Sequence, residues 1–114
     1  MTLQEIIKLI YEKTIPELKQ LCTKGVDFKI RDPYDQNNIL IAYSGYGYSD
    51  KYEQTEMVDF LLSCGLDINH QKNKRDHELS ALHMAVANHH LKIVQALIDR
   101  GANIEIQDST GNTP

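Results

Sequence analysis

The sequence predicts an all-α solenoid, in which short helix-turn-helix units stack side by side. Three observations indicate this fold. Apolar residues recur at the spacing of one helical face in several segments. A helix end marked by glycine occurs three times, at Gly25, Gly65 and Gly101. The step from Ala81, near the start of one unit, to Pro114, at the same place in the next, is 33 positions, a period typical of helical repeats.

Length and composition allow one domain with one core. The 114 residues are 41% hydrophobic, which is enough for a packed interior. No apolar run is long enough for a membrane span, and the amphipathic N-terminus is not a signal peptide. The net charge of −4 disfavours a nucleic-acid partner. Neither Cys22 nor Cys64 has the close spacing of a metal motif, and nothing requires an oxidising compartment, so we expect a cytoplasmic protein. Cys22 falls on the buried face of its helix and is expected to be inert.

The first helix pair is predicted from two capping motifs. Thr2 is followed by Glu5, and Thr14 by Glu17, at the spacing that lets each side chain bond to the backbone of the other. Pro16 is tolerated early in the second helix, because the first amides of a helix lack intrahelical partners. We expect these helices near residues 2–12 and 15–24.

The second and third units each end in an amphipathic helix. Met57, Phe60 and Leu61 share one face in the second unit, as Ile93 and Leu97 do in the third. Such stripes are most often core. Helices are therefore expected near residues 38–45, 52–64, 80–88 and 90–100, with extended loops near 26–37, 66–79 and 102–113.

Residues 80–103 carry the motif of a known family. Ser80–Ala85 reads Ser-Ala-Leu-His-Met-Ala, and Gly-Ala-Asn follows at 101–103. The chain therefore resembles the ankyrin-repeat family, whose units read Thr-Pro-Leu-His-x-Ala. The resemblance implies projecting β-hairpin-like loops, and for His83 a role in tying neighbouring loops together. It divides the single domain into units near residues 1–34, 35–76 and 77–109, with the start of a further repeat at 110–114.

Two units are longer than the family's period. The steps between the three glycines are 40 and 36 positions, and we expect the additions mainly around residues 44–54 and 70–78. Insertions fall in exposed loops, where function concentrates. Because the last repeat is incomplete and repeat arrays usually end in a polar capping unit, we also expect the natural chain to continue beyond Pro114.

No catalytic or metal-binding set is predicted. His70, His77, His89 and His90 do not form the tetrahedral set of ligands that zinc needs. Gly45–Asp50 superficially resembles a phosphate-binding loop, but no strand precedes it and Asp50 would repel a phosphate. We expect no cofactor, no metal and no small-molecule substrate.

The resemblance implies a non-catalytic module that binds one protein partner through its loop tips and first helices. Tyr46 and Tyr48 are included among the predicted contact residues because tyrosine is common in binding hot spots. The alternative is that these tyrosines serve packing alone. Lys72, Lys74 and Arg75 form a basic run that is either a solvated loop or steers an acidic partner. The predicted partner-binding residues are Asp35, Gln36, Asn37, Tyr46, Tyr48, Lys74, Arg75, His77, Met84, Ala87, Asn88, Ser109 and Thr110.

Three classes of function stay open at this stage. The first is a dedicated protein inhibitor or immunity protein, as among small bacterial ankyrin proteins. The second is an adaptor or scaffold domain of a longer protein, such as a host-directed bacterial effector. The third is an enzyme whose catalytic domain follows Pro114. For the partner we expect a contact area of about 800 Å² on each side.

Overall fold

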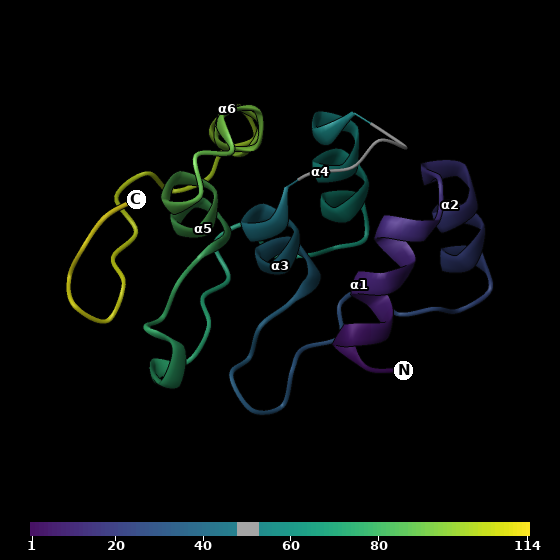
Figure 1. Ribbon diagram of the computed structural model, residues 1–114, viewed down its shortest axis with the longest axis horizontal. Helices are drawn as coiled ribbons and strands as arrows, with labels where there is room; N and C mark the ends of the chain where they lie inside the picture. The colour runs from purple at the N-terminus through teal and green to yellow at the C-terminus, as the bar shows by residue number, and fades with distance from the viewer. Residues whose placement is uncertain (48–52) are drawn as a thin grey trace.

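The computed structural model describes residues 1–47 and 53–114. This part of the chain forms three helical hairpins that stand side by side (Figure 1). The six helices are α1 (Leu3–Glu12), α2 (Ile15–Thr23), α3 (Ile39–Tyr46), α4 (Gln54–Ser63), α5 (Ala81–Ala87) and α6 (Leu91–Asp99). The predicted all-α solenoid is confirmed, with the ends of these helices within two residues of the expected positions. The expected start of the fourth helix, at residue 52, lies outside the described residues.

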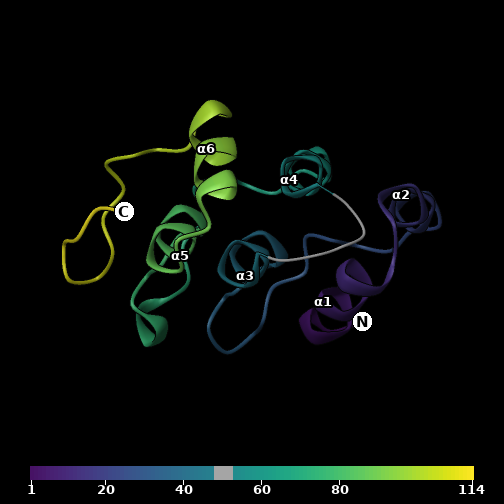
Figure 2. The same cartoon turned by 45° about the horizontal axis from the view of Figure 1, so that its top comes forward.

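The helices form two layers. The first helices of the hairpins, α1, α3 and α5, lie in one layer, and the second helices, α2, α4 and α6, lie in the other (Figures 1 and 2). The loops between hairpins leave the helices and project below the first layer in the view of Figure 1. We call α1, α3 and α5 the inner helices and α2, α4 and α6 the outer helices.

Local sequence sets where the helices start and stop. The Thr2 and Thr14 hydroxyls cap α1 and α2, and Glu5 and Glu17 complete both predicted capping boxes. The outer helices end at the three predicted glycines, whose φ angles of 91° to 98° lie in the left-handed region that side chains with a Cβ avoid. Each glycine turns the chain into the loop that follows.

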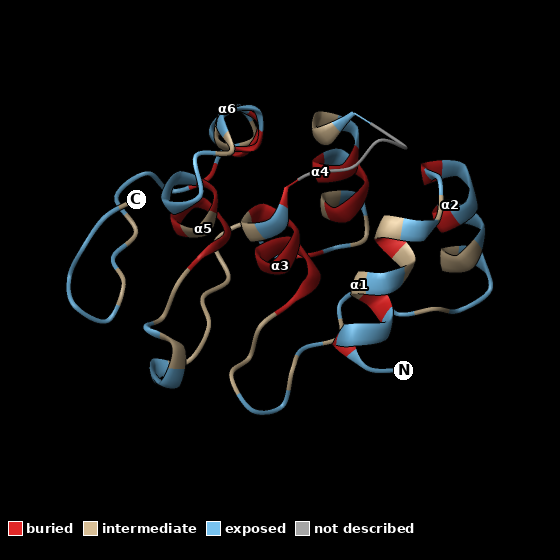
Figure 3. Cartoon of the chain, in the orientation of Figure 1, coloured by how far each residue is buried: buried red, intermediate tan, exposed pale blue. Residues whose placement is uncertain are grey.

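The core lies between the layers and between the hairpins (Figure 3). The inner helix α3 packs against α1, α4 and α5, and this is why Ile39–Ser44 are all buried. Phe28 and Phe60 meet edge to face with ring centroids 5.4 Å apart, joining the first loop to α4. The hairpins therefore bury each other's apolar faces, as expected for repeats that cannot fold alone.

The predicted insertion in the second unit separates α3 from α4. These helices are joined by residues 47–53, whereas α5 and α6 are joined by 88–90. In the outer layer, the Arg100 guanidinium donates to both carboxylate oxygens of Asp59 and so joins α6 to α4. None of the helices in the described part of the chain combines the length and the apolar composition that crossing a membrane requires.

Candidate partner-binding surface

The first loop is a tight turn that hydrogen bonds to its own aspartate side chains hold in place. Near its base, the Asp32 amide donates to the Asn37 carbonyl at 2.8 Å, and the Gln36 amide donates back to the Asp32 carbonyl at 2.9 Å. The Asp32 carboxylate accepts the Tyr34 amide, and the Asp35 carboxylate accepts the Asn37 amide. These short side-chain-to-backbone bonds are what Asp provides in turns, and they fix the tip over residues 32–37.

The second loop is the most regular of the three. Lys72 donates its amide to the Leu79 carbonyl, and Gln71 and Ser80 form an isolated antiparallel bridge. At the tip, Lys74–Asp76 make one turn of 3₁₀ helix that the Asn73 side chain caps. This is the expected hairpin-like geometry. Within the described residues it consists of a single bridge, and no extended β-strand forms.

The third loop is organised by Asp108. Its carboxylate accepts the amides of Thr110 and Asn112, at 2.9 and 3.0 Å, and the Thr110 hydroxyl at 2.8 Å. These bonds hold the pKa of Asp108 below its usual range, with the Thr110 hydroxyl as the largest cause. A charged carboxylate therefore fixes the tip near residues 108–112.

The tips of the first two loops are tied to each other. The Asn73 amide donates to the Asp35 carbonyl at 2.9 Å, and the Asn73 side-chain amide donates to the Tyr34 carbonyl at 2.8 Å. Below them, His70 Nε2 donates to the Gln36 carbonyl at 2.7 Å. The Arg75 guanidinium carbon lies 4.5 Å from the centre of the Tyr34 ring, within the range of a cation–π contact.

The second and third loops are tied in the same manner. The Ser109 amide donates to the His77 carbonyl at 2.9 Å, and the Gln71 side chain donates to the Gln107 carbonyl at 2.7 Å. The predicted role of His83 is confirmed: its Nδ1 accepts the Ser80 amide at 3.2 Å while its Nε2 donates to the Asn112 carbonyl at 3.0 Å. We call the three connected tips, residues 32–37, 72–79 and 107–112, the loop-tip row.

The inner helices add an apolar recess beside this row. It has a volume of about 180 Å³ and lies between α3 and α5. Ile41 and Ala42 contribute from α3, and Met84 contributes from α5. At its edge, Tyr46 is 61% exposed and meets Tyr11 edge to face at 6.4 Å.

The structure places the predicted contact residues in two groups. Asp35, Gln36, Lys74, Arg75, His77, Ser109 and Thr110 all lie on the loop-tip row. Tyr46 and Asn88 border the recess that Met84 lines, and Ala87 is exposed at the end of α5. Asn37 also belongs to the row: it is half-buried, as Asp35 and Gln36 are, and it lines the recess, with its side-chain oxygen enclosed. Tyr48 lies outside the described residues.

The basic run of the second loop is not a free charged patch. Lys72 forms an ion pair with Asp76, and only 10% of its side chain is exposed. Arg75 is exposed but stacks on Tyr34. Lys74 is the member of the run that is exposed and has neither the ion pair of Lys72 nor the stacking of Arg75. Steering by this run would therefore depend on two charges rather than three.

Two further features were not predicted from the sequence. Tyr34 is 67% exposed and stands at the first tip under Arg75, which makes it a contact candidate equal to Tyr46. The sequence feature that could have identified Tyr34 as a contact residue is its position next to Asp35 in an exposed turn. The second feature is that the thiols of Cys22 and Cys64 lie 3.7 Å apart, although 42 positions separate them.

The histidines are used as hydrogen-bonding groups. His70 and His83 tie loops together, and His90 Nδ1 donates to the Ser44 carbonyl at 2.9 Å, joining the third hairpin to α3. In the part of the chain that the structure describes, no group of three His, Cys, Asp or Glu side chains is placed to hold a metal ion.

The fold and its loops define a class of protein: a helical repeat solenoid with a continuous row of loop tips. A family model described as ankyrin repeats (3 copies) matches residues 6–108. The chain belongs to the ankyrin-repeat family. The repeats of this family are protein–protein interaction modules and are generally not catalytic.

Known proteins with similar segments are much longer than this chain. An ankyrin repeat protein of fowlpox virus (strain NVSL), FPV244, is 31% identical over 108 residues, which cover 91% of this chain and 15% of that protein. The E3 ubiquitin-protein ligase hecd-1 of Caenorhabditis elegans is 28% identical over 96% of this chain and 4% of its own length. An L-asparaginase of Dirofilaria immitis is 28% identical over 85% of this chain and 20% of its own length. The chain thus spans a fifth or less of each relative.

Proposed function

We propose that this chain is a non-catalytic module that holds one protein partner against its loop-tip row and the recess between α3 and α5. The observation that carries this proposal is the set of bonds between consecutive loops, above all those from Asn73 to Tyr34 and Asp35. Loops that are ordered before binding lose less conformational entropy when a partner arrives. Because hydrogen bonds tie the loops of the row to one another, the row is suited to bind the surface of a partner that is already folded.

Two tyrosines and one arginine are the best candidates for binding anchors. Tyrosine and arginine are enriched among the residues that dominate interface energies. Tyr34 and Arg75 support each other at the row, and Tyr46 stands at the recess. Lys74, exposed at the second tip beside Arg75, adds a positive charge, which favours a partner with an acidic patch near its contact.

A dedicated inhibitor or immunity protein is one form of this function, and the irregular length of the second unit supports it. The alternative is an adaptor or scaffold segment, which the much greater length of the relatives supports. In both forms we expect a cytoplasmic location and no activity of this chain on a substrate. The ligase and asparaginase activities named for two relatives are not carried over, because the matched segments are small parts of those proteins.

The experiment is a binding comparison with a matched control. The whole chain captures its partner from the lysate of its own cells, and the partner, identified by mass spectrometry, is then purified and titrated. A variant with Tyr34→Ala, Tyr46→Ala, Lys74→Ala and Arg75→Ala should bind at least about 100-fold more weakly than the original chain. Tyr48→Ala should also weaken capture and leave the melting curve unchanged.

The control variant carries Glu56→Ala, Lys92→Ala and Gln95→Ala, three exposed positions on the outer helices. It should bind within about threefold of the original chain, because it leaves the row untouched. Equal affinity of the loop variant and the original chain would show that the partner uses another surface.

A further inference from the structure

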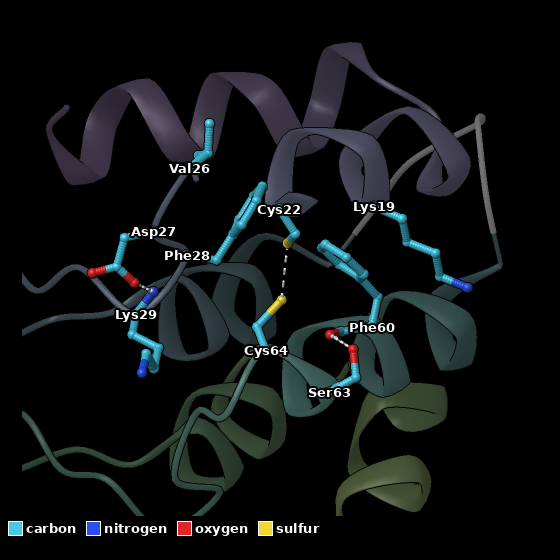
Figure 4. A pocket seen from close by; sticks show the side chains of 9 residues that line it. All are labelled: Lys19, Cys22, Val26, Asp27, Phe28, Lys29, Phe60, Ser63 and Cys64. Atoms are coloured by element: carbon cyan, nitrogen blue, oxygen red, sulfur yellow. Dashed lines mark hydrogen bonds between the residues drawn. The ribbon is translucent and has the colours of Figure 1, made fainter. Parts of the chain in front are cut away.

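The two cysteines of the chain meet between the first and second hairpins. The Sγ atoms of Cys22, on α2, and Cys64, directly after α4, lie 3.7 Å apart, close enough for one thiol to donate a hydrogen bond to the other (Figure 4). The contact arises because both residues stand near the ends of stacked outer helices, shortly before Gly25 and Gly65. It therefore depends on the repeat fold and not on closeness in sequence.

Small molecules can reach this pair. Both thiols line a surface pocket of about 380 Å³, and both cysteines are only partly buried. Phe28 and Phe60 also line the pocket, and Lys19 and Lys29 lie on opposite sides of the thiols in Figure 4. With the Asp27 carboxylate also in the lining, these two lysines leave one net positive charge at the pocket, which favours the entry of an anionic thiol reagent.

The surroundings distinguish the two thiols. Burial raises the pKa of Cys64 to about 12, and the hydrogen bond with Cys22 adds to the rise. The thiolate is the attacking form of cysteine, so Cys64 is poorly suited to attack first. Cys22 is the better first nucleophile, and Cys64 is suited to the second, intramolecular step.

We propose that Cys22 and Cys64 are a redox-active pair that forms a reversible disulfide between α2 and α4 when a low-molecular-weight disulfide such as oxidised glutathione is present. The Cys22 thiolate attacks one glutathione sulfur, forms a mixed disulfide and releases the first glutathione thiolate. Cys64 then loses its proton to solvent and attacks the Cys22 sulfur, which releases the second glutathione. Two protein thiols are oxidised, and one glutathione disulfide is reduced to two thiols.

The required movement is small. A disulfide places the sulfurs about 2.05 Å apart, so the thiols at 3.7 Å must approach by roughly 1.7 Å. The bond would close a loop from residue 22 to residue 64 and tie the first two hairpins together. A cross-link of this kind stabilises a fold chiefly by restricting the unfolded chain.

The test exposes the reduced, folded chain to oxidised glutathione and follows its intact mass. The expected product has lost two hydrogens, carries no glutathione, and yields one peptide in which Cys22 is linked to Cys64. Its melting temperature should rise by about 8–17 °C and return on reduction. The same chain in denaturant should form this link at least about tenfold more slowly, because only the fold holds the thiols together.

Single variants test the order of the steps. Cys64→Ser should retain one glutathione on Cys22, whereas Cys22→Ser should react at least about tenfold more slowly, at Cys64. The proposal is overturned if the folded chain keeps both thiols free to alkylation, holds glutathione at both positions, or links only to other molecules. These mass measurements on the original chain do not involve the partner, so their outcome is independent of the proposed function.

Discussion

His83 Nε2 lies 3.0 Å from the backbone oxygen of Asn112, which belongs to the loop after the third hairpin. At the same time, its Nδ1 accepts the amide of Ser80 at the start of α5. One buried imidazole thus fixes a helix start and the next loop together, with its proton on Nε2. This arrangement shows how the motif couples local capping to the stacking of loops.

Removing this imidazole should weaken the third unit. His83→Ala leaves the Ser80 amide and the Asn112 carbonyl without their partner, and we expect a loss of about 1–3 kcal/mol in the free energy of unfolding. Urea denaturation measures it. His89→Asn is the control: His89 is exposed with φ near 58°, a conformation that Asn tolerates, so this change should stay within about 0.5 kcal/mol. Equal effects of the two substitutions would contradict the role of His83.

Tyr34 and Arg75 should stabilise the contact between the first two tips. A double-mutant cycle with Tyr34→Ala and Arg75→Ala should give a coupling free energy of about 0.5–1 kcal/mol, as expected for an exposed cation–π pair. The pair Tyr34→Ala and Lys74→Ala serves as the reference cycle and should show no coupling. If both cycles give zero, the Arg75 side chain does not rest on Tyr34 in solution.

The ion pair between Asp59 and Arg100 should make stability depend on pH. The hydrogen bond from Arg100 is the largest cause that lowers the pKa of Asp59, and it outweighs the opposing effect of burial. Because the folded pKa is the lower one, this stabilisation is complete above the ordinary aspartate range and is lost as the pH falls through the folded value. Asp59→Asn should therefore cost at most about 1 kcal/mol at neutral pH, since the pair is largely solvated.

The measurement for this pair is the difference in unfolding free energy between Asp59→Asn and the original chain, followed from neutral to acidic pH. It should shrink toward zero in acid and also in high salt, which screens exposed charges. A difference in unfolding free energy that grows as the pH falls would contradict a lowered pKa of Asp59 in the folded chain.

Two leucines of α6 should respond very differently to truncation. Leu97 is fully buried between the layers, and Leu97→Ala should cost about 2–5 kcal/mol in unfolding free energy. Leu91, on the same helix, is 74% exposed, and Leu91→Ala should change stability by less than about 0.5 kcal/mol. Calorimetric melting of both variants checks this. Similar costs would mean that α6 packs through another face.

The fold was predictable because its signals are local. The capping boxes of Thr2 and Thr14, and the glycines that end the outer helices, depend on spacings of a few residues that the sequence displays directly. The tie made by His83 was predictable from the family motif.

Contacts between units could not be read in the same way. The 3.7 Å approach of Cys22 to Cys64 depends on how two hairpins of unequal length come into register. Likewise, the ion pair of Lys72 with Asp76 requires the turn at the second tip, so the sequence alone left Lys72 in a solvated basic run.

The most direct test of the proposed function is hydrogen–deuterium exchange of this chain, free and bound to the partner captured with it. In the bound chain we expect slower exchange at residues 32–37, 72–79 and 107–112 and at the ends of α3 and α5, with α2, α4 and α6 unchanged. Protection confined to the outer helices, with the loop-tip row exchanging as in the free chain, would contradict the proposed function.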